Sequence, residues 1–316
     1  MTEKINFSGV QYLTVDKNNI GQRVDNFLIN RLNNLPKSKI YKILRKGEVR
    51  VNKKRIKAEY KLQLNDEIRI PPLYLEEKKE IFIPDYFLDL IQKRVIFTDE
   101  NFLIFNKPAG IAVHAGSQRE YGLIDVVKKI WGENYAHLAH RIDRDTTGVL
   151  VLAKNRPALN AFQQASKDGR ITKKYIFRTN DGREKCREIQ IYLKKTEING
   201  EEKMLICKKD EPNSKLAITQ FAIRQKFLGA KLVEAKLLSG RTHQIRVSVK
   251  SQGFGIAGDK KYGDFQFNRK IENLGYKSMF LHAEFIEFEY QNRKISVRAE
   301  LGEEEKKLLA KIANKN

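Results

Sequence analysis

Apolar and polar positions near the start of the chain alternate first with a helical and then with a strand-like period. Residues 24–32 place Val, Phe and Leu side chains on one face of a helix that Pro36 ends. A second helix is predicted over residues 38–46, with Gly47 as its stop. Residues 48–70 follow as short strand-like runs. We therefore expect a small α/β unit in which two helices precede the strands.

From Val95 onward, short runs of Ile, Phe, Val and Leu alternate with turns. Only Arg156–Lys167 reads clearly as a helix. The pattern favours an α+β fold with a largely antiparallel mixed sheet flanked by helices. The expected strands are 95–97, 103–106, 149–153, 175–178, 220–223, 232–238 and 286–288.

A charged stretch separates these two regions. Glu76, Glu77, Lys78, Lys79 and Glu80 follow one another, and a proline comes soon after. We therefore predict a linker at 76–92 between a small domain at 11–75 and a larger one at 93–316.

Composition narrows the class of protein. The 316 residues are 41% hydrophobic, enough for one or two folded domains, and no apolar run approaches the ~20 residues of a membrane helix. The start lacks the apolar core of a signal peptide. Two cysteines are too few for a disulfide framework. A cytoplasmic protein without a membrane segment is the expectation.

The positive charge is concentrated in the small domain. The chain has 61 Lys and Arg against 39 Asp and Glu, a net charge of +22. Residues 36–57 contain 10 basic residues and one acidic residue. A region of such high positive charge attracts polyanions such as nucleic acids. A lysine-rich surface that binds no ligand would have the same composition. The candidate RNA contacts are Lys37, Lys39, Lys42, Arg45, Lys46, Arg50, Lys53, Lys54 and Arg55.

Two polar segments could carry chemistry. Residues 140–148, His-Arg-Ile-Asp-Arg-Asp-Thr-Thr-Gly, run directly into an apolar strand. Charges at the end of a buried strand must be paired, in a salt-bridged loop, or used in a reaction. Residues 240–247 place Arg246 between Ile245 and Val247, which predicts a strand there. A buried arginine in that strand requires a carboxylate partner.

Other kinds of site find no support in the sequence. No phosphate-binding Gly-x-x-x-x-Gly-Lys-Ser/Thr loop and no Gly-x-Ser-x-Gly nucleophile elbow are present. The five histidines, at positions 114, 137, 140, 243 and 282, form no metal-binding pair. His282 alone is typical of a structural histidine rather than a catalyst.

The small domain resembles the RNA-binding domain of ribosomal protein S-four. Gln22-Arg23-Val24-Asp25 and the stretch from Pro36-Lys37-Ser38 through Arg50-Val51-Asn52 carry the likeness. The cationic face of its second helix suits the shape and phosphates of folded RNA.

The larger domain resembles the pseudouridine synthase family, whose members modify uridines of ribosomal RNA. The segment 140–148 looks like the central motif of that family, and 240–246 and Leu-His-Ala at 281–283 match later motifs in the same order. Within the family, the likeness points to enzymes of 23S-type large-subunit ribosomal RNA. It implies that a uridine is flipped out of its helix, its glycosidic bond is cleaved, and carbon 5 joins the ribose.

The resemblance also implies roles for four residues in catalysis. Asp143 is expected to be the catalytic aspartate and Tyr175 the aromatic residue that stacks on the base. Arg246 is expected to pair with Asp143, with Arg241 as the alternative partner. A carboxylate out of water stays ionised when a guanidinium is paired with it.

The remaining expectations concern the substrate. Arg141 should enter the helix where the uridine was, and Ile245 should pack on the flipped ring. His140 and Arg241 are further candidate substrate contacts. The isomerisation involves no redox step or hydrolysis, so neither a cofactor nor a metal is expected, and a monomer is the predicted state. Two alternatives stay open: a non-catalytic RNA-binding or ribosome-assembly factor, and a synthase that acts on transfer RNA.

Overall fold

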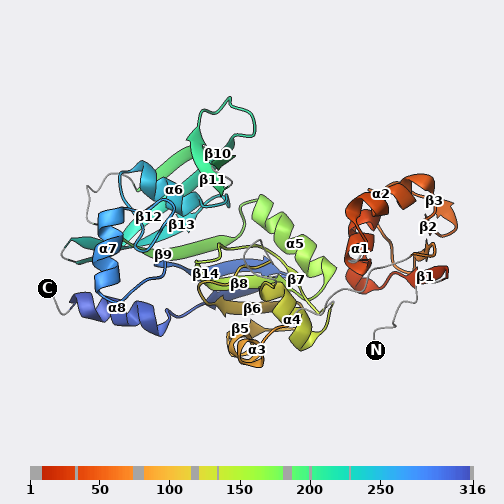
Figure 1. Ribbon diagram of the computed structural model, residues 1–316, viewed down its shortest axis with the longest axis horizontal. Helices are drawn as coiled ribbons and strands as arrows, with labels where there is room; N and C mark the ends of the chain where they lie inside the picture. The colour runs from red at the N-terminus through yellow and green to blue at the C-terminus, as the bar shows by residue number, and fades with distance from the viewer. Residues whose placement is uncertain are drawn as a thin grey trace. The chain divides into compact units, whose positions relative to one another are not determined.

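Hydrophobic side chains gather into separate cores in two units of the chain. One unit is formed by Met1–Phe82 together with Ala153–Asn160, and the other by Ile83–Leu152 and Ala161–Asn316. The elements of both are labelled in Figure 1. This computed structural model describes residues 9–32, 35–73, 82–114, 121–133, 135–180, 187–198, 201–227 and 229–313.

The N-terminal unit has the two predicted helices and, after them, short strands within residues 48–70. A further strand at Gln11–Thr14, which the sequence pattern does not predict, precedes the helices and pairs with the last strand of the unit. Gly47 ends the second helix in a left-handed conformation (φ 70°), and its N–H bonds the carbonyls of Ile43 and Leu44. A four-stranded sheet follows in the order β1-β4-β2-β3. The elements are β1 (Gln11–Thr14), a 3-10 turn (Lys17–Asn19), α1 (Val24–Arg31), α2 (Lys37–Lys46), β2 (Arg50–Val51), β3 (Lys54–Arg55) and β4 (Glu67–Ile70).

The apolar face of α1 and α2 forms the core of this unit. Val24, Phe27 and Leu28 are buried with Ile40 and Leu44, as the helical spacing predicts. Burying each such side chain stabilises the fold by about 1.5–3 kcal/mol. The lysine side chains of α2 lie on the opposite face of the helix and are exposed to solvent.

An 11-stranded mixed sheet forms the centre of the larger unit. Its main path runs β11-β10-β12-β13-β9-β14-β8-β6-β5, with β15 paired to β14 and β7 to β8. β14 pairs with β8 in parallel, whereas its pairing with β9 is antiparallel. The strands are β5 (Val95–Thr98), β6 (Phe102–Lys107), β7 (His137–Leu138), β8 (Thr147–Ala153), β9 (Thr172–Asn180), β10 (Glu188–Ile198), β11 (Glu201–Cys207), β12 (Lys215–Phe227), β13 (Ala230–Leu237), β14 (Leu281–Tyr290) and β15 (Arg293–Arg298).

Six of the seven predicted strands lie within β5, β6, β8, β9, β12 and β14, and the seventh, 232–238, extends one residue beyond the end of β13, so the predicted fold class is confirmed. The predicted helix at Arg156–Lys167 is α5, and its Phe162 ring packs against Phe288 of β14 with centroids 5.0 Å apart.

The helices differ from the prediction in two respects. Residues 85–92, expected in the linker, form helix α3, which buries Phe87 and Ile91 and packs against α4. The expected single helix is joined by others of only 8–11 residues, a length over which periodicity alone does not separate a helix from a strand. They are α3 (Asp85–Gln92), α4 (Leu123–Trp131), α6 (Gln244–Ser251), α7 (Phe265–Asn273) and α8 (Glu303–Ala313). Residues 76–81 of the predicted linker lie outside the described residues.

Candidate active site

The polar loop before β8 is anchored by a close approach of two parallel strands. Gly148 of β8 lies opposite Ala283 of β14, with a φ of +102°. A Cβ at this position would lie 2.2 Å from the Ala283 carbonyl oxygen, so only glycine fits. Beside it, the Thr147 hydroxyl lies 2.8 Å from Nδ1 of buried His282. His282 is therefore part of the scaffold, as its sequence context predicts.

The expectation that Arg246 lies in a strand is wrong. Residues 244–251 form helix α6, which buries Ile245, Val247 and Val249 and packs against β10, β11 and β12. Apolar residues at every second position indicate a strand only when one face of the segment is buried. Here tertiary packing buries most of a short helix, so local periodicity could not separate the two states.

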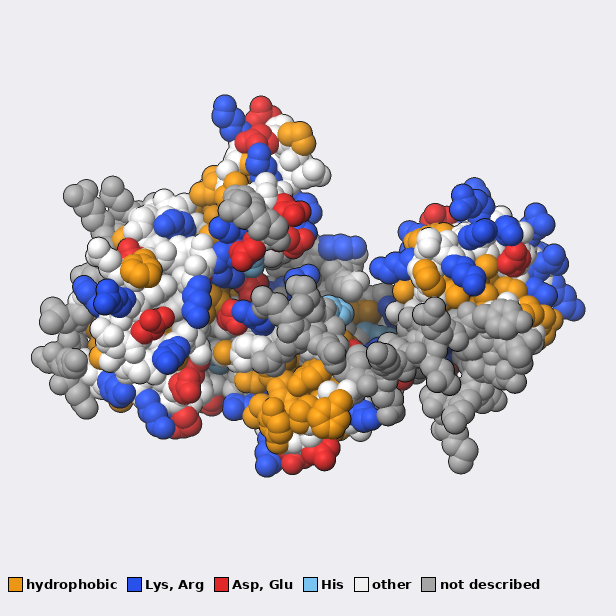
Figure 2. Space-filling view, in the orientation of Figure 1, with side chains coloured by type: hydrophobic (Ala, Val, Ile, Leu, Met, Phe, Trp, Pro, Cys, Tyr) orange, Lys and Arg blue, Asp and Glu red, His pale blue; other side chains and the backbone are white. Residues whose placement is uncertain are grey.

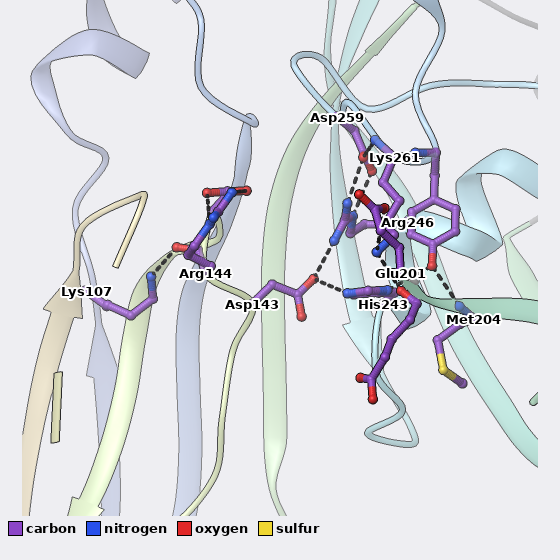
Figure 3. A network of polar contacts seen from close by, with 12 residues as sticks. Lys107, Asp143, Arg144, Glu201, Met204, His243, Arg246, Asp259 and Lys261 are labelled. Atoms are coloured by element: carbon purple, nitrogen blue, oxygen red, sulfur yellow. Dashed lines mark hydrogen bonds and ion pairs between the residues drawn. The ribbon is translucent and has the colours of Figure 1, made fainter. Parts of the chain in front are cut away.

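Arg246 joins two carboxylates from different loops (Figure 3). Its Nη1 donates a hydrogen bond to Asp143 Oδ2 at 3.0 Å. Its Nε and Nη2 each donate at 2.8 Å to the two oxygens of Asp259. A bidentate pair fixes the plane of the guanidinium, so Asp259 orients Arg246 and Arg246 in turn holds Asp143.

The electrostatics of this triad follow from burial and pairing. Side-chain exposure is 10% for Arg246 and 1% for Asp259, against 23% for Asp143. Burial alone would lower the pKa of Arg246, but its contacts with Asp259 and Asp143 outweigh burial and raise that pKa. Burial would also raise the pKa of Asp259, yet Arg246 keeps it below its usual value. At neutral pH both groups are charged.

Tyr175 and Ile245 lie in the same hydrophobic cluster, on β9 and α6. Burial, reinforced by the charge of nearby Asp143, raises the pKa of Tyr175, so its hydroxyl stays protonated at neutral pH. Of the residues predicted to work with Asp143, Arg246 bonds to it and Tyr175 lies close enough for its charge to act on the phenol, while Ile245 shares the hydrophobic cluster of Tyr175.

Comparison with known proteins identifies the family. The family model described as RNA pseudouridylate synthase matches residues 101–251, and the S4 domain model matches residues 22–68. A relative from Vibrio parahaemolyticus, named ribosomal large subunit pseudouridine synthase C, is 42% identical over 287 residues, covering 89% of each chain. A relative of the same name from Escherichia coli is 36% identical, covering 96% of this chain and 97% of its own. The chain belongs to the RNA pseudouridine synthase family.

Solved structures agree with this family at the level of the fold. The human protein RNA Pseudouridylate Synthase Domain Containing 4 aligns with a TM-score of 0.58 at 23% identity, covering 72% of this chain and 96% of its own. Human RNA Pseudouridylate Synthase Domain Containing 1 aligns with a TM-score of 0.53 at 21% identity, covering 66% and 82%.

This chain is therefore a synthase that isomerises uridine to pseudouridine in RNA, and its N-terminal unit contains an S4 domain. Within the described residues, no three His, Cys, Asp or Glu side chains are grouped so that they could hold a metal ion. Nor does any helix among those residues have the length and apolar character needed to cross a membrane.

The other predicted site residues of the synthase are not part of the ion pair. The structure pairs Asp143 with Arg246 and not with Arg241, whose exposed side chain donates from Nε to the Leu216 carbonyl at 3.0 Å. Arg141 is exposed. The His140 ring accepts a hydrogen bond at Nε2 from the Val151 N–H at 3.0 Å, and burial lowers the pKa of His140 to about 3.

The nine candidate RNA contacts of the S4 region are all exposed. Figure 2 shows Lys and Arg side chains gathered over α2 and the adjoining strands β2 and β3 of the N-terminal unit. Among them, Lys46 lies 3.6 Å from Glu48, whose side chain is itself exposed. The cationic face that the helical spacing predicts is thus present on the N-terminal unit.

Sequence reasoning assigned no role to two further residues of the synthase site. Asp259 lies 13 residues after Arg246 and in none of the motifs described above, although a buried arginine requires carboxylate partners. Lys107 is fully buried, and its Nζ donates to the carbonyls of Pro108, Ile111 and Arg144 at 2.8, 3.0 and 2.8 Å. It thereby ties the end of β6 to the loop that carries Asp143.

Proposed function

We propose that this synthase acts on uridines of 23S-type large-subunit ribosomal RNA. The names of the bacterial relatives, which match over nearly the whole chain, support this substrate. The observation that carries the proposed mechanism is the Asp143–Arg246–Asp259 triad beside Tyr175. A ribosomal RNA substrate also implies a cytoplasmic location.

The reaction begins with extraction of the target nucleotide. A uridine in a stack cannot reach Asp143, and flipping it out costs a few kcal/mol. Arg141, exposed at the start of the loop, fills the gap in the helix. Tyr175 stacks on the base and recovers about 1–3 kcal/mol, while Ile245 packs on the ring. Exposed Arg241 and partly exposed His140 contact the flanking RNA.

Asp143 then acts at the ribose. An ionised carboxylate near carbon 1′ either attacks that carbon or stabilises the positive charge that develops on it as the bond to nitrogen 1 breaks. The base turns and carbon 5 bonds to carbon 1′; if the carboxylate attacked that carbon, its bond to carbon 1′ breaks in the same step. The proton on carbon 5 is then lost and nitrogen 1 gains a proton, so the product is an isomer of the substrate and the step needs no oxidant or reductant.

In this proposal the N-terminal unit increases the affinity of the synthase for RNA. Its cations contact phosphates, which position RNA without reading its sequence. We also propose that the synthase is a monomer, which light scattering of the purified protein would test.

The substrate can be tested by mapping pseudouridine in a strain that lacks the gene. Carbodiimide-dependent stops of reverse transcriptase mark pseudouridines, and we expect specific stops to vanish from 23S-type RNA but not from transfer RNA. Restoring the gene should restore them. Loss of stops in transfer RNA would favour the transfer RNA alternative. No change in either RNA would favour a non-catalytic assembly factor.

A further inference from the structure

Two side-chain nitrogen atoms lie close to the same oxygen of the Asp143 carboxylate (Figure 3). Arg246 Nη1 lies 3.0 Å from Oδ2, and His243 Nε2 lies 3.8 Å from the same oxygen. Within the described part of the chain, no residue donates a hydrogen bond to Oδ1. The two oxygens of Asp143 therefore have different surroundings.

The tautomer of His243 is determined by the hydroxyl group of Tyr262. The Tyr262 oxygen accepts a hydrogen bond from the Met204 N–H at 2.9 Å and lies 2.8 Å from His243 Nδ1. If the tyrosine donates its proton to Nδ1, every group is satisfied, whereas a proton on Nδ1 would leave the buried phenol hydrogen unpaired. The favoured tautomer therefore has its hydrogen on Nε2, facing Asp143.

Tyr262 is itself held in place by Arg246. The guanidinium carbon of Arg246 lies 4.9 Å from the centroid of the Tyr262 ring, a distance typical of a cation–π contact. Tyr262 thus contacts both Arg246 and His243, the two residues that face Oδ2 of Asp143.

The backbone of His243 determines which substitution gives a matched control. It adopts the left-handed conformation (φ 54°) at the start of α6, and its side chain makes no capping bond to the helix. Histidine, asparagine and aspartate adopt this region more often than other non-glycine residues. Asparagine adopts this conformation readily, so it provides a matched control.

We propose that His243 is a positioning residue that, together with Arg246, holds Oδ2 of Asp143 and leaves Oδ1 free to meet the sugar of the flipped nucleotide. The inference rests on the proposed role of Asp143. It goes further by assigning the reacting atom and the residue that selects it.

The charge state of His243 agrees with this role. Burial lowers the pKa of His243, and nearby Asp143 opposes that effect. Of the other charged groups that face the ring, Arg246 and Lys261 lower the pKa of His243 further, whereas Asp259 raises it. The ring is neutral at pH 7, so it orients the carboxylate by its N–H dipole without neutralising the charge.

Two variants separate a positioning role from a purely structural one. His243→Asn keeps the left-handed backbone and a group able to bond Tyr262, but it is too short to reach Asp143. His243→Gln places an amide N–H where Nε2 was. In single-turnover assays on a ribosomal RNA fragment, we expect His243→Asn to lower the rate by roughly 10- to 100-fold with unchanged RNA affinity. We expect His243→Gln to recover most of that loss.

The tautomer can be observed directly by nitrogen NMR of protein labelled at histidine. The His243→Asn spectrum identifies the missing signals among the five histidines. We expect the wild-type ring to be protonated at Nε2 and expect Tyr262→Phe to shift it toward a mixture of tautomers. A wild-type ring protonated at Nδ1 would overturn the inference.

The rate measurements separate failure of this inference from failure of the proposed function. A wild-type rate for His243→Asn, with Asp143→Asn inactive, removes the positioning role alone. An active Asp143→Asn removes the proposed role of Asp143 and, with it, the inference.

Discussion

At the scale of residues, the guanidinium of Arg246 connects the two carboxylates of the site. Arg246 donates two hydrogen bonds to Asp259 and one to Asp143, so Asp259 is held more firmly than Asp143. The more buried Asp259 is saturated by donors, which include the backbone N–H groups of Lys261 and Tyr262. Asp143 keeps some exposure, as a group that must meet a substrate requires.

Replacing Asp143 by asparagine should abolish isomerisation and leave RNA binding almost unchanged. The substitution removes the charge that acts at the ribose but only one charge of a strongly cationic chain. Release of tritium from carbon 5 of labelled uridine measures the reaction, and filter binding measures affinity. Turnover comparable to wild type would exclude Asp143 from the central role.

Replacing Asp259 by asparagine should lower both stability and rate. Breaking one side of a buried ion pair costs about 3–5 kcal/mol, and Arg246 would lose the plane in which it holds Asp143. Thermal unfolding and single-turnover assays measure the two effects.

Glu202→Gln is the matched control for that variant, since it breaks the exposed pair with Lys195. Exposed pairs contribute about 0–1 kcal/mol, so the control should unfold near the wild-type temperature. Equal effects of the two variants would contradict the structural role of Asp259.

At the scale of elements, the ends of β6 and β8 determine where the catalytic loop lies. β8 is anchored by the close approach of Gly148 to β14, and β6 is connected to the loop through Lys107. Each anchor depends on one residue, which makes each testable by substitution.

Gly148→Ala should destabilise the synthase by about 2–4 kcal/mol, because a Cβ would overlap the Ala283 carbonyl and the backbone would remain left-handed. Denaturant unfolding measures the loss. Gly240→Ala is a suitable control, since its Cβ would have only a 4.0 Å contact with Lys173 Nζ. A Gly148→Ala protein as stable as the control would show that β8 and β14 can separate without cost.

Lys107 should make stability depend on pH. Burial lowers the pKa of Lys107 from 10.5 to about 7, opposed by the charges of Asp145 and Asp143. Between these pH values the unfolded chain binds more protons than the folded one, so the contribution of Lys107 to stability increases with pH. The melting temperature of wild type relative to Lys107→Met should therefore rise from pH 7 to pH 9. A constant difference would contradict the lowered pKa.

At the scale of the whole molecule, the cluster of exposed cations and the catalytic residues lie in different units. The exposed cations of α2, β2 and β3 lie in the N-terminal unit, whereas the ion pair of Asp143 lies in the larger one. Affinity for RNA can therefore be changed without touching the catalytic residues.

Replacing Lys39, Lys42 and Arg45 together by alanine should weaken RNA binding and reduce its salt dependence. Each phosphate contact that is lost lowers the slope of log affinity against log salt by about 0.7–0.9, so a change of about 2–3 is expected. Titrations at several salt concentrations measure the slope. The control replaces three lysines of α8, Lys306, Lys307 and Lys311. An unchanged slope in the α2 variant would exclude these cations from the RNA interface.

The sequence by itself determined the elements whose pattern is local. The spacing of apolar residues identified α1, α2 and α5, and runs of apolar residues identified seven strands of the large sheet. The order of the motifs also identified the family, because short motifs keep their residues regardless of how the loops between them fold.

The tertiary structure alone decided which partners meet. Asp143 and Arg246 are 103 residues apart in the chain, and no local pattern could choose between Arg246 and Arg241. Packing against β10, β11 and β12 made a helix of the segment around Arg246, and this helix turns its guanidinium toward Asp259. Local periodicity reports only how a segment buries its own side chains, whereas ion pairs and the conformation of short buried segments depend on what the rest of the chain brings against them.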